Sequence, residues 1–309
     1  MRKRINISYA TLTLLLTAAL MLAACSSDST DDAPDQPQQD EIRLKADTWQ
    51  FMAGTRATTY NSTNLQSETF TCYAYHAGTT TKYIDGSPVS YTDGNWSFTD
   101  GKKYWPATGS LDFFAYMPAT KPDYITSGPT YTEDHNVTFT STNLDMVNAT
   151  EFIYALTLDQ NKTYNADGVS LTFKHPFARI TLQWADYDHS AITSVTVKFK
   201  GVKNNGSYSF DGTTSTSTWT PSGDETDFTV TSLDDNGSST PTYYLAIPQE
   251  WAGAIEVNAY WNDWGDTPVE HTVTATIPTT WESGYSYTYT FNITPEDLTV
   301  NTSNFTEQW

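Results

Sequence analysis

The sequence predicts an all-β protein, and three observations support this fold class. Aromatic and β-branched residues favour strands, and the 309 residues include 20 Tyr, 14 Phe and 10 Trp. Short segments in which apolar and polar residues alternate recur along the chain, as expected for half-buried strands. Between many of them lie Asp-Gly or Asn-Gly pairs, which tolerate the positive φ of tight hairpin turns. Many short strands with such turn signals are typical of β-sandwiches.

Residues 1–24 have the features of an export signal. A basic start is followed by a short apolar run, which ends at Leu22-Ala23-Ala24-Cys25. Such a run is too short for a spanning helix, and a cysteine at this junction resembles a bacterial lipoprotein signal. The resemblance implies cleavage before Cys25 and lipidation of Cys25. No later apolar run reaches the about 20 residues that a spanning helix needs, so the lipid would be the only anchor.

Residues 25–41 hold six acidic and no basic side chains. This composition predicts a solvated tether between the lipid and the folded part of the chain. An acidic stretch directly after a lipidated cysteine resembles the surface-export signal of some gram-negative lipoproteins. A plain spacer explains the composition equally well. We therefore expect a protein anchored by lipid in the outer membrane, at the cell surface of a gram-negative bacterium.

From residue 42 onward the alternation predicts strands and turns in order. The first strand covers residues 42–53, with Ile42, Leu44 and Ala46 on one face. Later strands are expected over 69–76, 96–99, 111–117, 136–140, 170–173, 178–184, 194–200, 243–247, 255–261, 269–277 and 285–293. Residues 151–158 suit a short helix or a strand. Turn pairs begin at Asp85, Asp93, Asp100, Asp167, Asn205, Asp211 and Asn236. A boundary near residues 164–169 predicts two sandwiches, 42–167 and 168–309.

Several function classes are disfavoured by the composition. The formal charge of −20 repels nucleic acid, and no basic patch is present in the sequence. After Cys25 the only cysteine is Cys72, so no internal disulfide is expected. The sequence has no nucleophile elbow, metal-binding helix motif, phosphate-binding loop or Cys-x-x-Cys pair. We therefore predict no catalysis, no metal site and no cofactor.

One segment is a candidate binding loop. Residues 260–266 carry Trp261 and Trp264 together with two Asp and a Gly. This combination is suited to stacking a sugar ring and accepting its hydroxyl hydrogens. The alternative is a hairpin in which one tryptophan covers the edge of a core.

Four stretches of the sequence stand out: residues 55–58, residues 104–106 followed by 111–118, residues 171–180, and residues 245–248 leading to 284–291. They cover nearly the whole exported chain and follow the lipoprotein signal. In this order they resemble the fimbrillin family, the Mfa-like subunits of type V pili. The resemblance implies two tandem transthyretin-like β-sandwich domains.

The resemblance also implies proteolytic processing and assembly by strand exchange. Cleavage would follow an arginine after the first strand, and the matching bond joins Arg56 to Ala57. The residues fit, because Arg56 lies in a loop-like Gly-Thr-Arg-Ala-Thr-Thr stretch, whereas Arg179 lies within an apolar strand. An ordinary solvated arginine is the alternative, and some family members keep this strand.

Removal of residues 25–56 would leave an apolar groove where Ile42, Leu44 and Ala46 had been. The open backbone groups of such a groove favour addition of a strand from another chain. The segment 297–309, with Leu298, Val300 and Phe305, alternates as a donor strand should. It is equally suited to be the last strand of its own domain, and the sequence does not separate the two.

The leading hypothesis is therefore a structural and adhesive subunit of a cell-surface pilus, exported as a lipoprotein. Its expected partners are other pilus subunits, the outer membrane through the lipid, and glycans or proteins of host or bacterial surfaces. The alternative is a monomeric surface lipoprotein that binds glycans through Trp261 and Trp264.

Overall fold

The structure of the protein is a computed structural model that describes residues 40–48, 64–184, 192–231, 242–261, 269–294 and 297–303. All of these residues belong to one compact unit, which begins at Asp40. The predicted signal, Cys25 and most of the predicted tether lie outside the described residues. Within the described part of the chain, no helix is long and apolar enough to cross a membrane.

Strands dominate the regular structure, which confirms the predicted all-β class. The helical exception within the described ranges is a 3-10 turn, η1 Leu65–Ser67. The strands of the first half are β1 Leu44–Thr48, β2 Thr69–His76, β3 Lys82–Thr92, β4 Asn95–Phe98, β5 Leu111–Met117, β6 Ile125–Tyr131, β7 Asn136–Ser141 and β8 Ile153–Gln160. Those of the second half are β9 Val169–Phe173, β10 Ala178–Trp184, β11 Ile192–Asp211, β12 Thr216–Thr231, β13 Thr242–Ala246, β14 Glu250–Trp251, β15 Ala254–Trp261, β16 Val269–Thr276, β17 Thr279–Thr280, β18 Ser286–Thr294 and β19 Asp297–Ser303. Residues 151–158, for which the sequence left helix or strand open, fall mostly in β8.

Seven strands form the first sheet, in the order β8-β5-β2-β3-β4-β1-β9. Its two end strands approach each other, because Tyr154 at β8 forms an isolated bridge with Lys174, just after β9. The sheet therefore curls around a core that includes Phe70, Phe113 and Phe173. Alternate side chains of the same strands point to the other face, which explains why nearly every residue of β5 is buried.

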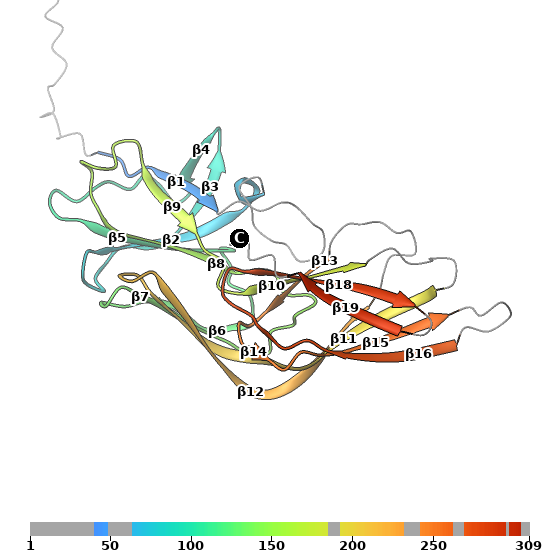
Figure 1. The fold of residues 1–309 in the computed structure, drawn as a ribbon. Coiled ribbons are helices and arrows are strands. Elements are labelled where there is room, and N and C mark those ends of the chain that lie inside the picture. Colours follow the sequence, from blue (N-terminus) through green and yellow to red (C-terminus); the bar gives the residue numbers. More distant parts are fainter. Residues whose placement is uncertain are drawn as a thin grey trace, which may run out of the picture. The chain divides into compact units, whose positions relative to one another are not determined.

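The other face of this sheet packs on a second sheet, which has the order β16-β15-β11-β7-β6 with β12 also paired to β11. Tyr154 and Phe114 from the first sheet meet Phe139 and Tyr208 from the second in this core. A third core lies between β11 and β15 and the sheet β13-β10-β18-β19, and it includes Phe199 and Tyr289. Figure 1 shows β11 and β12 as one long hairpin that extends from β7 to β15. The hairpin therefore contributes to two cores.

A glutamine side chain supports β11 where the hairpin passes from one core to the other. The β11–β12 register shifts on either side of Lys203. There the buried side-chain amide of Gln249 forms the two hydrogen bonds that a neighbouring strand would otherwise form with Lys203. Its Oε1 accepts from Lys203 N–H (3.0 Å), and its Nε2 donates to Lys203 C=O (2.9 Å). Nε2 also donates to Ile247 C=O at 3.0 Å. These bonds satisfy backbone groups that a buried bulge would otherwise leave unpaired.

The predicted turn pairs have different outcomes. Asp93-Gly94 joins β3 to β4 with positive φ at both residues (52° and 83°), which confirms a tight hairpin turn. Two predicted turns are wrong, since Asp85-Gly86 lies within β3 and Asn205-Gly206 lies within β11. In the second pair, Asn205 binds another segment instead of forming a turn, because its Oδ1 accepts from Asn143 N–H at 2.6 Å. The pair at Asn236 lies outside the described residues.

The division of the chain after residue 167 stays a prediction. Segments on either side of it pair with each other in two places. β9 joins β1 in the first sheet, and β11 joins β7 in the second. Any boundary between two sandwiches is therefore crossed by strand ladders as well as by the connecting chain.

Candidate functional site: the first strand and its groove

The described chain begins with a segment that is bound by backbone hydrogen bonds from its first residue. Trp105 N–H donates to Asp40 C=O at 2.9 Å, and Ile42 N–H donates to Lys103 C=O at 2.8 Å. Glu41 and Tyr104 form an antiparallel bridge between these two bonds. Residues 40–42 are therefore held against residues 103–105 before β1 begins.

β1 then lies inside the first sheet rather than at its edge. On one side it pairs with β4 at Leu44 and Trp96, and on the other it runs parallel to β9 from Leu44↔Val169 to Thr48↔Phe173 (Figure 1). The approach to β9 is close at Gly168, which has a φ of 114°. A Cβ atom at this residue would lie 3.2 Å from Arg43 C=O, so glycine suits both the backbone angle and the space.

One face of this segment is buried. Ile42 and Leu44 retain only 3% and 5% of their exposure, and Ala46 is half-buried in the same core. The register places Leu44 beside Val169 and Ala46 beside Leu171, and both partners are buried. These contacts create an apolar seam between β1 and β9. The predicted first strand was longer, and its residues 49–53 lie outside the described residues.

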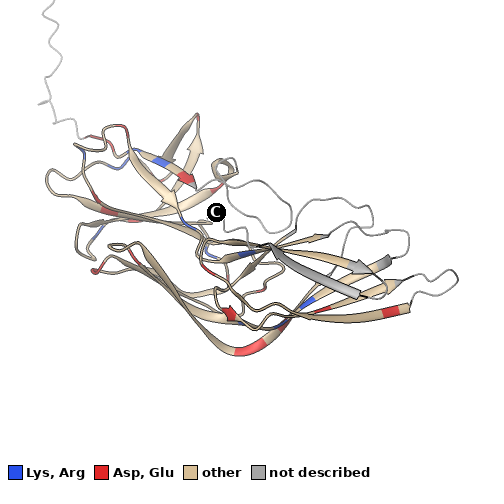
Figure 2. Ribbon diagram, in the orientation of Figure 1, with Lys and Arg blue, Asp and Glu red and all other residues tan. Residues whose placement is uncertain are grey.

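Apolar burial and backbone ladders hold this segment more strongly than its charges do. Fully burying an aliphatic side chain contributes about 1.5–3 kcal/mol. The ion pairs of Glu41 with Lys102 (2.8 Å) and Asp40 with Lys162 (3.5 Å) join largely exposed side chains, and exposed pairs contribute little. In Figure 2 the Lys and Arg residues are scattered along the ribbon of the described chain.

The two processing residues, Arg56 and Ala57, lie outside the described residues. The described chain resumes at Asn64, and η1 follows at once. Leu65 of η1 is 1% exposed and belongs to the same core as Ile42 and Leu44. The predicted cleavage site is therefore bounded on both sides by residues anchored in one core.

The predicted donor segment forms the last described strand. β19 pairs antiparallel with β18, with Leu298 opposite Ile293 and Val300 opposite Phe291. It is the end strand of the order β13-β10-β18-β19. In this structure the segment therefore pairs within its own chain, whereas its roles as a donor strand or as the last strand of its own C-terminal domain stay predictions. Phe305 lies outside the described residues.

The candidate binding loop is described only at its base. Trp261 is the last residue of β15 and pairs in register with Val269 of β16, whereas Trp264 lies outside the described residues. Two large side chains here are exposed: Tyr260, the first residue of the loop, at 37%, and Val269, which follows the loop, at 48%. The Glu270 carboxylate raises the pKa of Tyr260 by its charge and by accepting a hydrogen bond.

Other chemistry finds little support in the described part of the chain. Its His, Cys, Asp and Glu side chains form no group of three or more that could hold a metal ion. Cys72 is completely buried, and this burial raises the pKa of its thiol, which disfavours the reactive thiolate. The sequence did not identify the partners of this segment, which are residues 103–105 for residues 40–42 and the strands β4 and β9 for β1. Gly168 was the available signal, but it does not say which strand approaches it.

Comparisons with known proteins place the chain among solved structures of the same fold. No curated protein matches the sequence. A cell adhesion protein from Bacteroides ovatus is 14% identical with a TM-score of 0.54, over 86% of this chain and 96% of that one. A second cell adhesion protein, from Bacteroides uniformis, is 15% identical with a TM-score of 0.54, over 87% and 99%. A fimbrial protein from Bacteroides vulgatus is 16% identical with a TM-score of 0.55, over 85% and 98%.

The family comparison covers most of the sequence. The fimbrillin-like family model matches residues 55–309. The match begins beside Arg56 and includes the strands from β2 to β19. The chain therefore belongs to the fimbrillin-like family, whose members are structural proteins of fimbriae and adhesion rather than enzymes.

Proposed function

We propose that the protein is a structural subunit of a cell-surface pilus that assembles by protease-triggered strand exchange. It would be exported as a lipoprotein, lipidated at Cys25 and carried to the outer membrane. Cleavage between Arg56 and Ala57 would then release β1, and a strand from another subunit would take its place. The observation that carries this proposal is the position of β1, a strand at the start of the described chain that lies inside a sheet.

Loss of an interior strand differs from loss of an edge strand. When β1 leaves, both β4 and β9 lose a neighbour, as do the backbone groups of Lys103 and Trp105. The vacated space is bordered by buried side chains of β9, namely Val169, Leu171 and Phe173. An incoming strand therefore gains a parallel ladder and apolar burial together.

The donor that the chain offers most readily is its C-terminal segment. In the structure β19 is paired with β18, so its transfer to another subunit would exchange one ladder for another. The net gain must then come from side chains that enter the groove. Leu298, Val300 and Phe305 are the apolar residues that we assign to the donor strand, and each contributes about 1.5–3 kcal/mol if it becomes fully buried.

Trypsin treatment of the exported chain, residues 25–309, and of the same chain lacking residues 298–309 tests the proposal. We expect the exported chain to be cut after Arg56 before any site in the sandwiches, because loops are cut before packed strands, and to form a ladder of oligomers on unheated gels. The truncated chain should be cut at the same bond and form no ladder. An Arg56→Gln variant should remain uncut there, with Arg43→Gln as its matched control. Equal ladders from both chain lengths would exclude this segment as the donor.

A second candidate function is supported by the exposed side chains at the end of the β15–β16 hairpin. Tyr260 begins the candidate binding loop that carries Trp261 and Trp264, and Val269 follows it. Such a group suits a monomeric glycan-binding lipoprotein. This alternative predicts that residues 25–56 are retained in the protein at the cell surface. It also predicts that Trp264→Ala abolishes glycan binding.

A further inference from the structure

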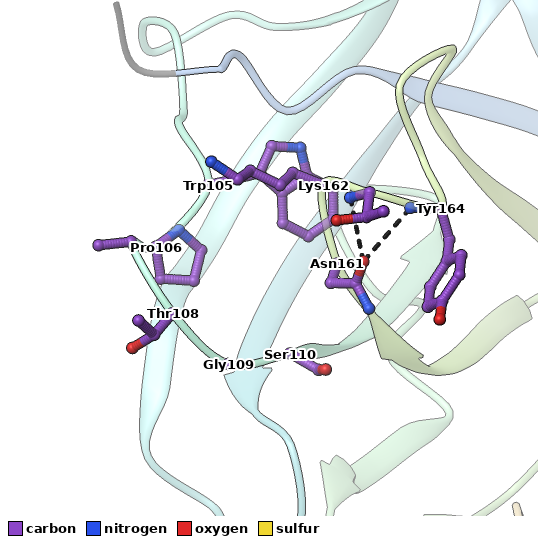
Figure 3. Close-up of a pocket in the computed structure, with 10 residues that line it drawn as sticks. Trp105, Pro106, Thr108, Gly109, Ser110, Asn161, Lys162 and Tyr164 are labelled. Carbon is purple, nitrogen blue, oxygen red and sulfur yellow. Dashed lines mark hydrogen bonds between the residues drawn. The ribbon is translucent and has the colours of Figure 1, made fainter. Parts of the chain in front are cut away.

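A pocket lies next to the residues that hold the N-terminal segment. It has a volume of about 350 Å³ and is lined by two stretches of chain, residues 105–110 and 161–164. Figure 3 shows Pro106 and Thr108 on one side of it and Asn161 and Tyr164 on the other. Pockets that bind small molecules have volumes of about 300 Å³ or more, so this pocket suits one sugar ring or a ligand of similar size.

Asn161 fixes one wall of the pocket. Its Oδ1 accepts from Thr163 N–H at 3.0 Å and from Tyr164 N–H at 3.3 Å (Figure 3). Its C=O accepts from the backbone N–H of Asn165 at 3.2 Å and from the Asn165 side-chain amide at 3.0 Å. These bonds use the oxygens of Asn161 and leave its Nδ2 as a donor on a loop of fixed geometry. Ser110 and Thr163 add hydroxyl groups to the lining.

Tyr164 and Trp105 supply the aromatic surface. Tyr164 is 82% exposed, the highest value among the large apolar side chains that the structure describes. Trp105 is only 4% exposed and belongs to the same core as Ile42. The pocket is therefore lined by one exposed aromatic side chain, Tyr164, and one buried aromatic side chain, Trp105.

The pocket also carries a positive charge that the N-terminal segment partly neutralises. Among the described residues that line it, Lys162 is the only basic one and none is acidic, although the chain has a formal charge of −20. Lys162 Nζ lies 3.5 Å from a carboxylate oxygen of Asp40. The backbone of Asp40 is bound to Trp105 N–H. Asp40 thus contacts two residues of the lining, and cleavage after Arg56 would remove it.

We propose that this pocket binds a sugar ring that carries a carboxylate, and that Asp40 weakens this binding until the N-terminal segment is released. The ring would stack on Tyr164, its hydroxyls would bond to Asn161 Nδ2 and the neighbouring hydroxyl groups, and its carboxylate would pair with Lys162. The increase in affinity after release of the N-terminal segment depends on the proposed cleavage, whereas binding of the sugar to the pocket does not. The adhesive surface would then be strengthened by the same step that prepares the subunit for assembly.

Isothermal titration of the uncleaved full chain with four probes tests the pocket. The probes are D-glucuronic acid, N-acetylneuraminic acid, glucose as the neutral ring and acetate as the carboxylate without a ring. We expect at least one acidic sugar to bind about tenfold more tightly than glucose or acetate. Tyr164→Ala and Lys162→Gln should each weaken that binding about tenfold. Binding of neither acidic sugar, or equal binding of glucose, would overturn the proposal.

Asp40→Asn in the uncleaved chain tests the control by Asp40 without any protease. Because the substitution removes the charge that competes for Lys162, the acidic sugar should bind about threefold to fivefold more tightly. Glu41→Gln is the matched control, since Glu41 pairs with Lys102 outside the pocket, and it should leave the affinity unchanged. Equal affinities of Asp40→Asn and the parent chain would overturn the control by Asp40. A failure of cleavage after Arg56 would change none of these results, so the two proposals fail separately.

Discussion

β1 and β19 are the first and last strands that the structure describes, and their sequences alternate in the same way, but their settings differ. β1 lies between β4 and β9 inside a seven-stranded sheet, whereas β19 is the end strand of a four-stranded sheet. β1 therefore has neighbours on both sides, and Ile42 and Leu44 are buried in the core beneath it. β19 has a ladder to β18 on one side.

This difference indicates which end of the chain can act as a receptor and which as a donor. Removal of an interior strand creates a gap with two backbone walls and an apolar floor. Removal of an edge strand only moves the edge by one position. A segment at the edge is also the easier one to transfer, because few ladders must open first. In the proposed strand exchange, the groove is therefore the space of β1 and the donated strand is β19.

The largest expected effect comes from a charge placed beneath β1. Leu44→Asp should lower the free energy of unfolding by about 4 kcal/mol, because it removes a buried aliphatic side chain and buries a carboxylate. Lys45→Asp on the exposed face of the same strand should change it by less than about 0.5 kcal/mol. Urea denaturation of both variants is the measurement. Similar costs for the two would contradict the one-sided burial of β1.

A smaller effect is expected where β1 approaches β9. Gly168→Ala should cost about 1–2 kcal/mol, because a Cβ there meets Arg43 C=O at 3.2 Å and the φ of Gly168 is positive. Gly109→Ala is the matched control, since Gly109 also has a positive φ but no atom within 4 Å of its Cβ position. The measurements are thermal unfolding and the rate of trypsin cleavage after Arg56. Faster cleavage in the Gly168 variant alone would show that its contact with Arg43 helps to hold β1 in place. Equal unfolding temperatures and cleavage rates of the two variants would refute the close approach.

The smallest effect is expected from the exposed ion pair beside β1. Glu41 accepts a hydrogen bond from Lys102 and raises the pKa of that amine. The pair therefore stabilises the segment below the usual pKa of lysine, and this contribution is lost as the pH rises through the raised value. Lys102→Gln should nevertheless leave the thermal midpoint at pH 7 almost unchanged, with little dependence on salt. A large drop would mean that charge, rather than apolar burial, holds β1.

Much of the fold follows from local sequence patterns. The alternation at Ile42, Leu44 and Ala46 indicates the buried face of β1, and Asp93-Gly94 indicates a hairpin turn. Local patterns fail where distant segments decide the conformation. Asn205-Gly206 has the composition of a turn, but it lies within β11 because β7 and β12 pair on either side of it.

The candidate site shows the same limit. The parallel pairing of β1 with β9 joins residues more than a hundred positions apart, and no local pattern specifies such a partner. The pocket beside Trp105 was not predicted either, because its two walls come from separate loops. Tyr164 is an ordinary residue in the sequence, and only its 82% exposure in the structure distinguishes it.

The most direct test of the proposed strand exchange is N-terminal sequencing of the polymeric protein recovered from the cell surface. We expect the chain in the polymer to begin at Ala57, so that Ile42, Leu44 and Ala46 are absent and their groove holds another subunit's strand. A polymer whose chains still begin at the lipidated Cys25 would contradict it, because the groove would then remain filled by β1.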